Sequence, residues 1–243
     1  MKALLLLTAL PALAIDHSAW DGLLKKYVNE QNRVDYARWK SADVPALDAY
    51  LAAIAAPWKN PDDKASLINA YNALTVRWVL THYPIVSIWK TKKPFREARH
   101  TVSGKKASLD EIETKLRKMG DPRIHSALVC AARSCPPLRR EAYVPERLDA
   151  QLEDNTIAWL ANPALHTFDA KARKAEISMI FKWYKEDFAA LHDFLAKYAP
   201  QHNWLKPGIK IAHKEYRWGL NDSGPLGENY GGTAFYWDAL RNR

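Results

Sequence analysis

Cysteine, internal repeats and long apolar segments are scarce in this sequence of 243 residues. It contains two cysteines, Cys130 and Cys135, and both lie in the stretch 121–138. Beyond residues 1–14, no segment is long and uncharged enough to cross a bilayer, which takes ~20 apolar residues in a helix. Internal repeats and low-complexity linkers are also missing, so nothing supports a second domain. The length suits one domain with a sizeable hydrophobic core.

The net charge is basic, and the charged residues are spread along the chain. Lys and Arg number 36 against 27 Asp and Glu, which gives a formal net charge of +9. No block of basic residues resembles a nucleic-acid-binding arm, and no recognised nucleic-acid or cofactor motif accompanies the charge. We therefore expect no nucleic-acid partner and no cofactor. A basic exported protein can instead associate with anionic polymers or lipid headgroups of the cell envelope.

Residues 1–14, MKALLLLTALPALA, have the three parts of a secretory signal peptide. Lys2 supplies the positive start, residues 3–10 the apolar core, and Ala12 and Ala14 the small residues of a cleavage site. We expect cleavage after Ala14 and a mature domain of residues 15–243 that is soluble in the periplasm or secreted. The residue directly after the cleavage point is Ile15 and not a cysteine, so no lipid anchor is expected.

Hydrophobic spacing and capping signals predict a helix-rich α+β domain. A capping box that starts at Ser108 predicts a helix ending near Met119. Other helices are expected at residues 17–28, 44–56, 62–83, 145–160 and 179–198, strands at 95–102, 124–130 and 209–212, and a hairpin at 167–177. We expect a small antiparallel sheet in which the strand at 124–130 packs against the helix at 62–83.

The stretch 121–138, DPRIHSALVCAARSCPPL, concentrates the reactive side chains of the chain. His125 lies on the apolar approach to Cys130, and Cys135 follows after a turn of small residues. In a strand, His125 and Cys130 differ by an odd number of positions and point to opposite faces. A dyad within the strand is then excluded, unless the strand is distorted near its end or Cys135 acts instead of Cys130.

Three polar residues on predicted helices are further candidates. Asn69 and Asn72 share a face of the helix at 62–83, where buried amides need hydrogen-bond partners. They either fix neighbouring loops or line a substrate pocket. Glu113 is either a solvated surface residue or part of the same site. We expect Asn69, Asn72, Glu113 and the cysteine turn to converge on one cleft.

Several ordered motifs resemble the bacterial family of domains of unknown function 547. The motifs are residues 68–74 (INAYNAL), 109–113 (LDEIE), 121–138, 180–188 and the closing residues 216–221, YRWGLN. The resemblance extends from about Pro57 to Asn221. At the level of fold, the domain is similar to papain-like and transglutaminase-like thiol enzymes.

The chain departs from the family pattern close to these motifs. Ser66 and Leu67 stand before the asparagine motif, and Ser126 stands after the histidine, at positions where bulky aromatic residues are common. Thr114 replaces a histidine that often follows the family's glutamate. A catalytic scheme that requires this second histidine is therefore weakened.

Two interpretations of the site are closely matched. In the first, the protein is a thiol-dependent hydrolase or acyl transferase that acts on a peptide or amide-type substrate, with Cys130 favoured over Cys135 as nucleophile. His125 takes the proton of the thiol, and Glu113 or an asparagine orients the imidazole. In the second, Cys130 and Cys135 form a disulfide, as an oxidising compartment favours, in a non-catalytic module that binds or supports the cell envelope.

A metal site is a third interpretation. His125, Cys130 and Cys135 are three soft ligands, and Glu113 or a water could complete a tetrahedron. Their spacing matches neither the C-x-x-C nor the H-E-x-x-H arrangement, so we expect no metal. The expected partner is therefore a substrate or an envelope component.

Overall fold

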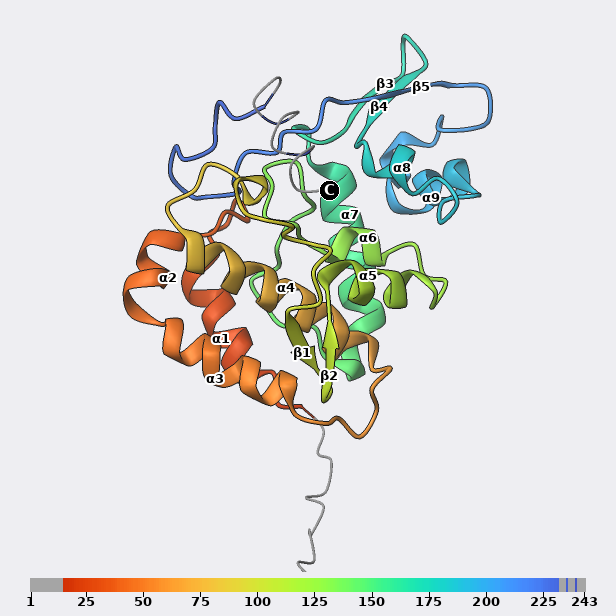
Figure 1. The fold of residues 1–243 in the computed structure, drawn as a ribbon. Coiled ribbons are helices and arrows are strands. Elements are labelled where there is room, and N and C mark those ends of the chain that lie inside the picture. Colours follow the sequence, from red (N-terminus) through yellow and green to blue (C-terminus); the bar gives the residue numbers. More distant parts are fainter. Residues whose placement is uncertain (1–14, 232–234, 236–238, 240–243) are drawn as a thin grey trace, which may run out of the picture.

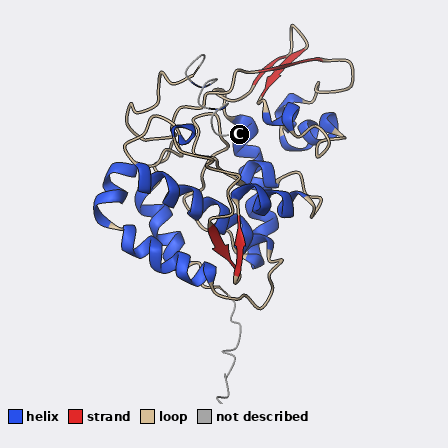
Figure 2. Ribbon diagram, viewed as in Figure 1, coloured by secondary structure: helices blue, strands red, loops and turns tan. Residues whose placement is uncertain are grey.

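The computed structural model describes residues 15–231, 235 and 239. The predicted signal peptide at residues 1–14 lies outside the described residues. Helices dominate the fold, and the strands form two small sheets (Figure 1, Figure 2). The prediction of one helix-rich α+β domain is confirmed. In the described part of the chain, we find no helix with the length and apolar character to cross a bilayer.

The central element is α4, Lys64–His82, which confirms the helix expected at 62–83. Asp63 caps it by accepting a hydrogen bond from the Ser66 amide at 2.8 Å. Every residue from Ala65 to Val76 is buried, as in a helix that is covered on all sides. In Figure 1, α1 to α3 lie on one side of α4, and α5 to α7 lie on the other.

The remaining helices are shorter than α4, and two of them, α2 and α6, were not predicted. Most of the expected bounds are reproduced within a few residues. The α-helices are α1 (Ser18–Tyr27), α2 (Tyr36–Ala42), α3 (Val44–Ala55), α5 (Leu109–Arg117), α6 (Ile124–Ala127), α7 (Leu148–Ala161), α8 (Ile180–Trp183) and α9 (Leu191–Tyr198), and the 3-10 turns are η1 (Ile88–Lys90), η2 (Pro145–Arg147) and η3 (Pro200–His202).

The single helix expected at 179–198 is wrong. The chain forms α8 and α9 with turns between them, and Tyr184 leaves the helical conformation with φ −115° and ψ 36°. Asp187 lies in this interruption, and its carboxylate is bound by Arg117 and His125. Tertiary contacts of one polar side chain therefore outweigh the helical spacing of the apolar residues around it.

The two sheets differ from the single antiparallel sheet that was expected. β1 (His100–Val102) pairs antiparallel with β2 (Lys105–Ala107) around a tight turn. In the second sheet, β3 (Thr167–Asp169) pairs antiparallel with β4 (Lys174–Ile177), which confirms the hairpin. β5 (Lys210–His213) adds to β4 in parallel. The sheet is therefore mixed.

The strand predicted at 124–130 is also wrong, because these residues form the helical turn α6 and then an extended segment that belongs to neither sheet. Side chains replace the missing strand partner. Asn72 donates to the Ala127 carbonyl and accepts from the Val129 amide, both at 2.9 Å, and Asn155 donates to the Ser126 carbonyl at 2.5 Å. These contacts satisfy the hydrogen-bonding needs of buried backbone groups without pairing to a neighbouring strand. His125 and Cys130 therefore do not lie on opposite faces of a strand, as the sequence predicted.

The capping box at the start of α5 is confirmed. Ser108 Oγ accepts from the Glu111 amide at 3.1 Å, and the Glu111 carboxylate accepts from the Ser108 amide at 2.6 Å. Ser108→Ala should lower the free energy of unfolding by about 1 kcal/mol, because the amide of Glu111 loses its acceptor. Urea unfolding would measure this loss. Ser41→Ala, at an exposed hydroxyl within α2, is the control. Equal losses in the two variants would contradict the capping role.

Candidate functional site

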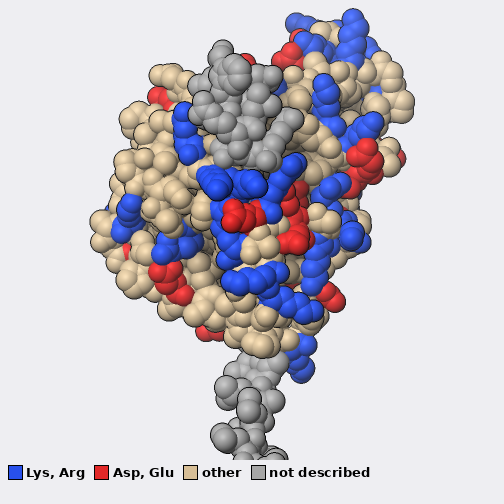
Figure 3. Space-filling view, viewed as in Figure 1, with Lys and Arg blue, Asp and Glu red and all other residues tan. Residues whose placement is uncertain are grey.

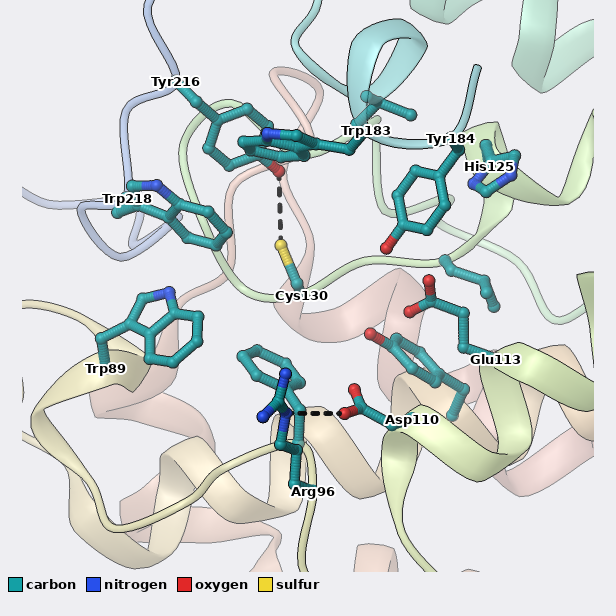
Figure 4. Close-up of a pocket in the computed structure, with 14 residues that line it drawn as sticks. Trp89, Arg96, Asp110, Glu113, His125, Cys130, Trp183, Tyr184, Tyr216 and Trp218 are labelled. Carbon is teal, nitrogen blue, oxygen red and sulfur yellow. Dashed lines mark hydrogen bonds and ion pairs between the residues drawn. The ribbon is translucent and has the colours of Figure 1, made fainter. Parts of the chain in front are cut away.

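A cavity of about 210 Å³ lies where several distant segments meet (Figure 4). Its wall is largely aromatic and contains a few ionisable side chains. The aromatic residues are Tyr71, Trp89, Phe95, Trp183, Tyr184, Tyr216 and Trp218, and the ionisable or sulfur-bearing residues are Arg96, Asp110, Glu113, His125 and Cys130. Three of the predicted site residues, Glu113, His125 and Cys130, therefore line one cavity.

Cys130 and Cys135 form a disulfide, with their Cα atoms 6.3 Å apart. The two sulfurs have unequal surroundings. Cys130 lines the cavity, whereas Cys135 is 6% exposed and accepts hydrogen bonds from the amides of Cys130 at 3.1 Å and Ala132 at 3.3 Å. Ala131, between these amides, has a φ of 62°. The turn thus surrounds the Cys135 sulfur with backbone amide donors, and Cys130 faces the cavity.

The hydroxyl of Tyr216 lies 3.4 Å from each of the two sulfurs. Tyr216 belongs to the irregular C-terminal segment, which is held against the cysteine turn by backbone hydrogen bonds. The Arg133 amide donates to Gly219 at 2.7 Å, and the Asn221 amide donates to Ala131 at 2.9 Å. The C-terminal segment is therefore part of the sulfur site.

His125 forms a hydrogen bond with a residue that the sequence did not single out. Its Nε2 lies 2.7 Å from Asp187 Oδ2, and Arg117 binds the same carboxylate through Nε at 2.6 Å and Nη2 at 3.1 Å. Burial lowers the pKa of His125 to about 4, and the Arg117 guanidinium lowers the pKa of Asp187. At neutral pH, the imidazole is neutral and the carboxylate is ionised.

The ring of His125 packs beside Tyr184, with ring centroids 4.4 Å apart. In Figure 4, Tyr184 lies on the side of His125 that faces the cavity, and Cys130 lies farther along the wall. The carboxylate that contacts the imidazole is Asp187, whereas Glu113 accepts a hydrogen bond from Tyr184. The structure therefore gives His125 a carboxylate partner other than the expected one.

Two carboxylates of α5 line the cavity. Asp110 and Glu113 are three positions apart on the helix and so share a face. Burial raises the pKa of each of them. Asp110 has an ion-pair partner in Arg96, with Nε 3.6 Å from Oδ2. Glu113 is instead held near the phenol of Tyr184, as Figure 4 shows.

Asn69 and Asn72 are buried, and neither lines this cavity. The amide of Asn69 donates to the Tyr143 carbonyl at 2.7 Å and accepts from the Tyr143 amide at 3.0 Å. Asn72 holds residues 127 and 129 in the same bidentate manner. The two asparagines thus fix loop backbones, and Asn72 positions the segment that leads to Cys130.

Sequence reasoning missed the residues that complete the site from the C-terminal part of the chain. Asp187, Tyr184 and Tyr216 are the principal ones, and Trp183 and Trp218 extend the aromatic wall. The motifs at 180–188 and 216–221 contained all five residues, so the signal was present in the sequence. The positions of these motifs in the sequence gave no indication that they lie beside the cysteine turn.

Two further observations bear on the site. Within the described residues, no three His, Cys, Asp or Glu side chains are grouped as a metal site would need.

Residues 55–160 match the family described as "Protein of unknown function, DUF547". No curated protein and no solved structure matches the chain, so the similarity to papain-like and transglutaminase-like enzymes stays a prediction.

Proposed function

We propose that this chain, whose residues 55–160 match the DUF547 family, is a thiol-dependent hydrolase or acyl transferase with Cys130 as nucleophile. One observation carries the proposal: Cys130, His125 and Glu113, from separate segments, line one cavity. A thiol and a neutral imidazole paired with a carboxylate are groups that acyl transfer uses, and Glu113 adds a carboxylate to the same cavity. The substrate class is an amide or ester.

The disulfide is the resting form in this proposal, and reduction releases the nucleophile. The thiolate of a dithiol reductant attacks the Cys130 sulfur, the sulfur–sulfur bond breaks, and Cys135 leaves as a thiolate. The second thiol of the reductant then frees Cys130 while the reductant becomes a disulfide. The amides of Cys130 and Ala132 would stabilise the departing Cys135 thiolate, since both already donate to its sulfur.

Acyl transfer then follows at Cys130. Its sulfur bonds to the acyl carbon, the bond to the leaving amine or alcohol breaks, and water or a second amine later releases the acyl group from the thioester. The neutral imidazole of His125 accepts the thiol proton, and Asp187 stabilises the imidazolium that forms. The imidazolium then donates this proton to the leaving amine or alcohol.

The proposal includes export. Residues 1–14 would direct the chain to the periplasm or beyond, where oxidation pairs accessible thiols. The disulfide itself favours a second candidate function, a non-catalytic envelope-binding module in which the Cys130–Cys135 bond is purely structural. The two functions differ in what the Cys130 thiol does after reduction.

An acyl-adduct experiment separates these functions. Wild-type protein and the variants Cys130→Ser and Cys135→Ser are incubated with p-nitrophenyl acetate, and adducts are located by mass spectrometry. We expect wild type to be acylated at Cys130 only after reduction, and Cys135→Ser to be acylated without reductant. Cys130→Ser should react at least about 100-fold more slowly, because it lacks the thiolate. Equal acylation of the two serine variants would leave the structural module as the function.

A further inference from the structure

We propose that the cavity beside Cys130 binds an organic ammonium group, so that the substrate is an amide or ester that carries a cation. That the bound molecule is a substrate rests on the proposed function. Binding of the ammonium group does not depend on thiol chemistry. We infer this because the cavity combines an aromatic wall with more carboxylates than cationic side chains.

The aromatic wall gathers several rings around Trp218, as Figure 4 shows. Trp183 stacks on Trp218 with centroids 5.7 Å apart and planes at 25°, and Trp89 meets Trp218 edge-on at 5.5 Å and 83°. Tyr216 closes the group, 4.5 Å from Trp218. Tryptophan and tyrosine faces attract cations through the ring quadrupole, and ammonium groups bind best where several rings surround them.

The ionisable groups of the cavity leave a negative charge without a full counterpart. Asp110 and Glu113 line it with Arg96 as the basic partner, and His125 is neutral at neutral pH because burial lowers its pKa to about 4. Arg96 pairs with Asp110. Among the ion pairs of the described residues, none includes Glu113, which relies on the phenol of Tyr184.

The nearest guanidinium on the same helix is already engaged. Arg117 follows Glu113 by one turn of α5, but it binds Asp187 through two nitrogens. A half-buried carboxylate with only a neutral donor is costly to keep ionised, and a bound ammonium group would remove that cost. An anionic ligand would add to the cost, so the charge of the cavity selects against it.

Trp183 lies at a solvent-exposed edge of the cavity. This side chain is 42% exposed, which is unusual among the large apolar residues of the described chain, and it stacks on the aromatic wall. Figure 3 shows carboxylates gathered in the region of α5 within a surface that is otherwise rich in Lys and Arg. The cavity is thus an acidic and aromatic site in a basic protein.

The test compares a cation with a neutral molecule of the same shape. Choline and 3,3-dimethylbutan-1-ol are titrated into the full-length Cys130→Ser variant, and tryptophan fluorescence is recorded. We expect choline to bind about tenfold more tightly, the equivalent of ~1.4 kcal/mol. Glu113→Gln should reduce the ratio to near one. Glu153→Gln, which changes a carboxylate of α7 outside the cavity, should leave it unchanged.

A second pair of variants tests the aromatic wall. Trp183→Ala should weaken choline binding severalfold, whereas Ile157→Ala, at the other exposed large apolar side chain of the described residues, should not. Equal binding of choline and its neutral analogue, stronger binding of a neutral methyl glycoside, or no binding of choline would each overturn the inference. Because Cys130→Ser lacks the nucleophile, none of these results depends on acyl transfer.

Discussion

Gly219→Ala is expected to lower the free energy of unfolding by about 3 kcal/mol or more, the largest effect of any single methyl group that we anticipate. A Cβ atom at position 219 would lie 1.7 Å from the carbonyl oxygen of Gly227. The opposing atom is backbone, so no side-chain rotation relieves the overlap. The chain on one side must move, and Leu220, whose amide donates to the Val86 carbonyl at 2.9 Å, would lose its place.

Chemical denaturation followed by circular dichroism would measure this loss. Gly22→Ala is the matched control, because nothing lies within 4 Å of a Cβ there and the residue is inside α1. Alanine should stabilise that helix by up to about 1 kcal/mol. The displacement of residues 216–221 should also impair acylation of Cys130, since Tyr216 contacts its sulfur. A Gly219→Ala protein as stable as wild type would refute the backbone contact.

Acid should unfold the protein largely through buried histidines. Burial lowers the pKa of His125 to about 4 and that of His166 to about 3, against 6.5 for an ordinary histidine. Between these values, only the unfolded chain binds the protons, so stability is complete above about pH 6.5 and falls as the pH falls. Each histidine contributes about 1.4 kcal/mol per pH unit, so the two together cost ~5 kcal/mol between pH 6.5 and 4.5. That is a large part of the stability of a typical domain.

His166→Phe isolates one half of this effect. His166 is 2% exposed, and neither of its ring nitrogens has a hydrogen-bond partner among the described residues. It packs edge-on against Trp159 and near Phe181, so a phenyl ring suits the site. The variant should equal or exceed wild type at pH 7.5 and exceed it by about 2 kcal/mol or more at pH 4.5.

Urea unfolding at both pH values would measure the difference. Contributions from the carboxyl groups, including the opposite one expected from Glu113, cancel in the comparison of the two proteins at each pH. A constant difference between the proteins from pH 7.5 to 4.5 would show that His166 does not titrate on unfolding.

Local signals in the sequence predicted much of the fold. Ser108 and Glu111 specified the start of α5 through two hydrogen bonds, and the broad apolar surface of the helix expected at 62–83 predicted the buried helix α4. The hairpin at 167–177 followed from its turn. In each case, the residues that determine the element are neighbours in the sequence, so the pattern is visible without the tertiary structure.

The mistakes arose where side chains from distant segments replace regular structure. Residues 124–130 have the composition of a buried strand, but Asn72 and Asn155 satisfy their backbone groups. The interruption after α8 depends on Asp187 binding Arg117, which precedes it by 70 positions. The same long-range contact gives His125 its carboxylate. Spacing along the chain contains no information about such partners.

The cavity straddles the boundary of the segment that matches the family, and this has a practical consequence for dissecting the protein. Residues 55–160 contain Glu113, His125 and both cysteines, whereas Trp183, Tyr184 and Asp187 lie beyond them. A fragment cut at the limits of the match would keep the sulfurs, but it would lose Asp187, the partner of the imidazole, and the part of the aromatic wall that comes from Trp183, Tyr184, Tyr216 and Trp218. Chimaeras that exchange residues 55–160 between relatives would therefore transplant the reactive groups while the recipient supplies the specificity.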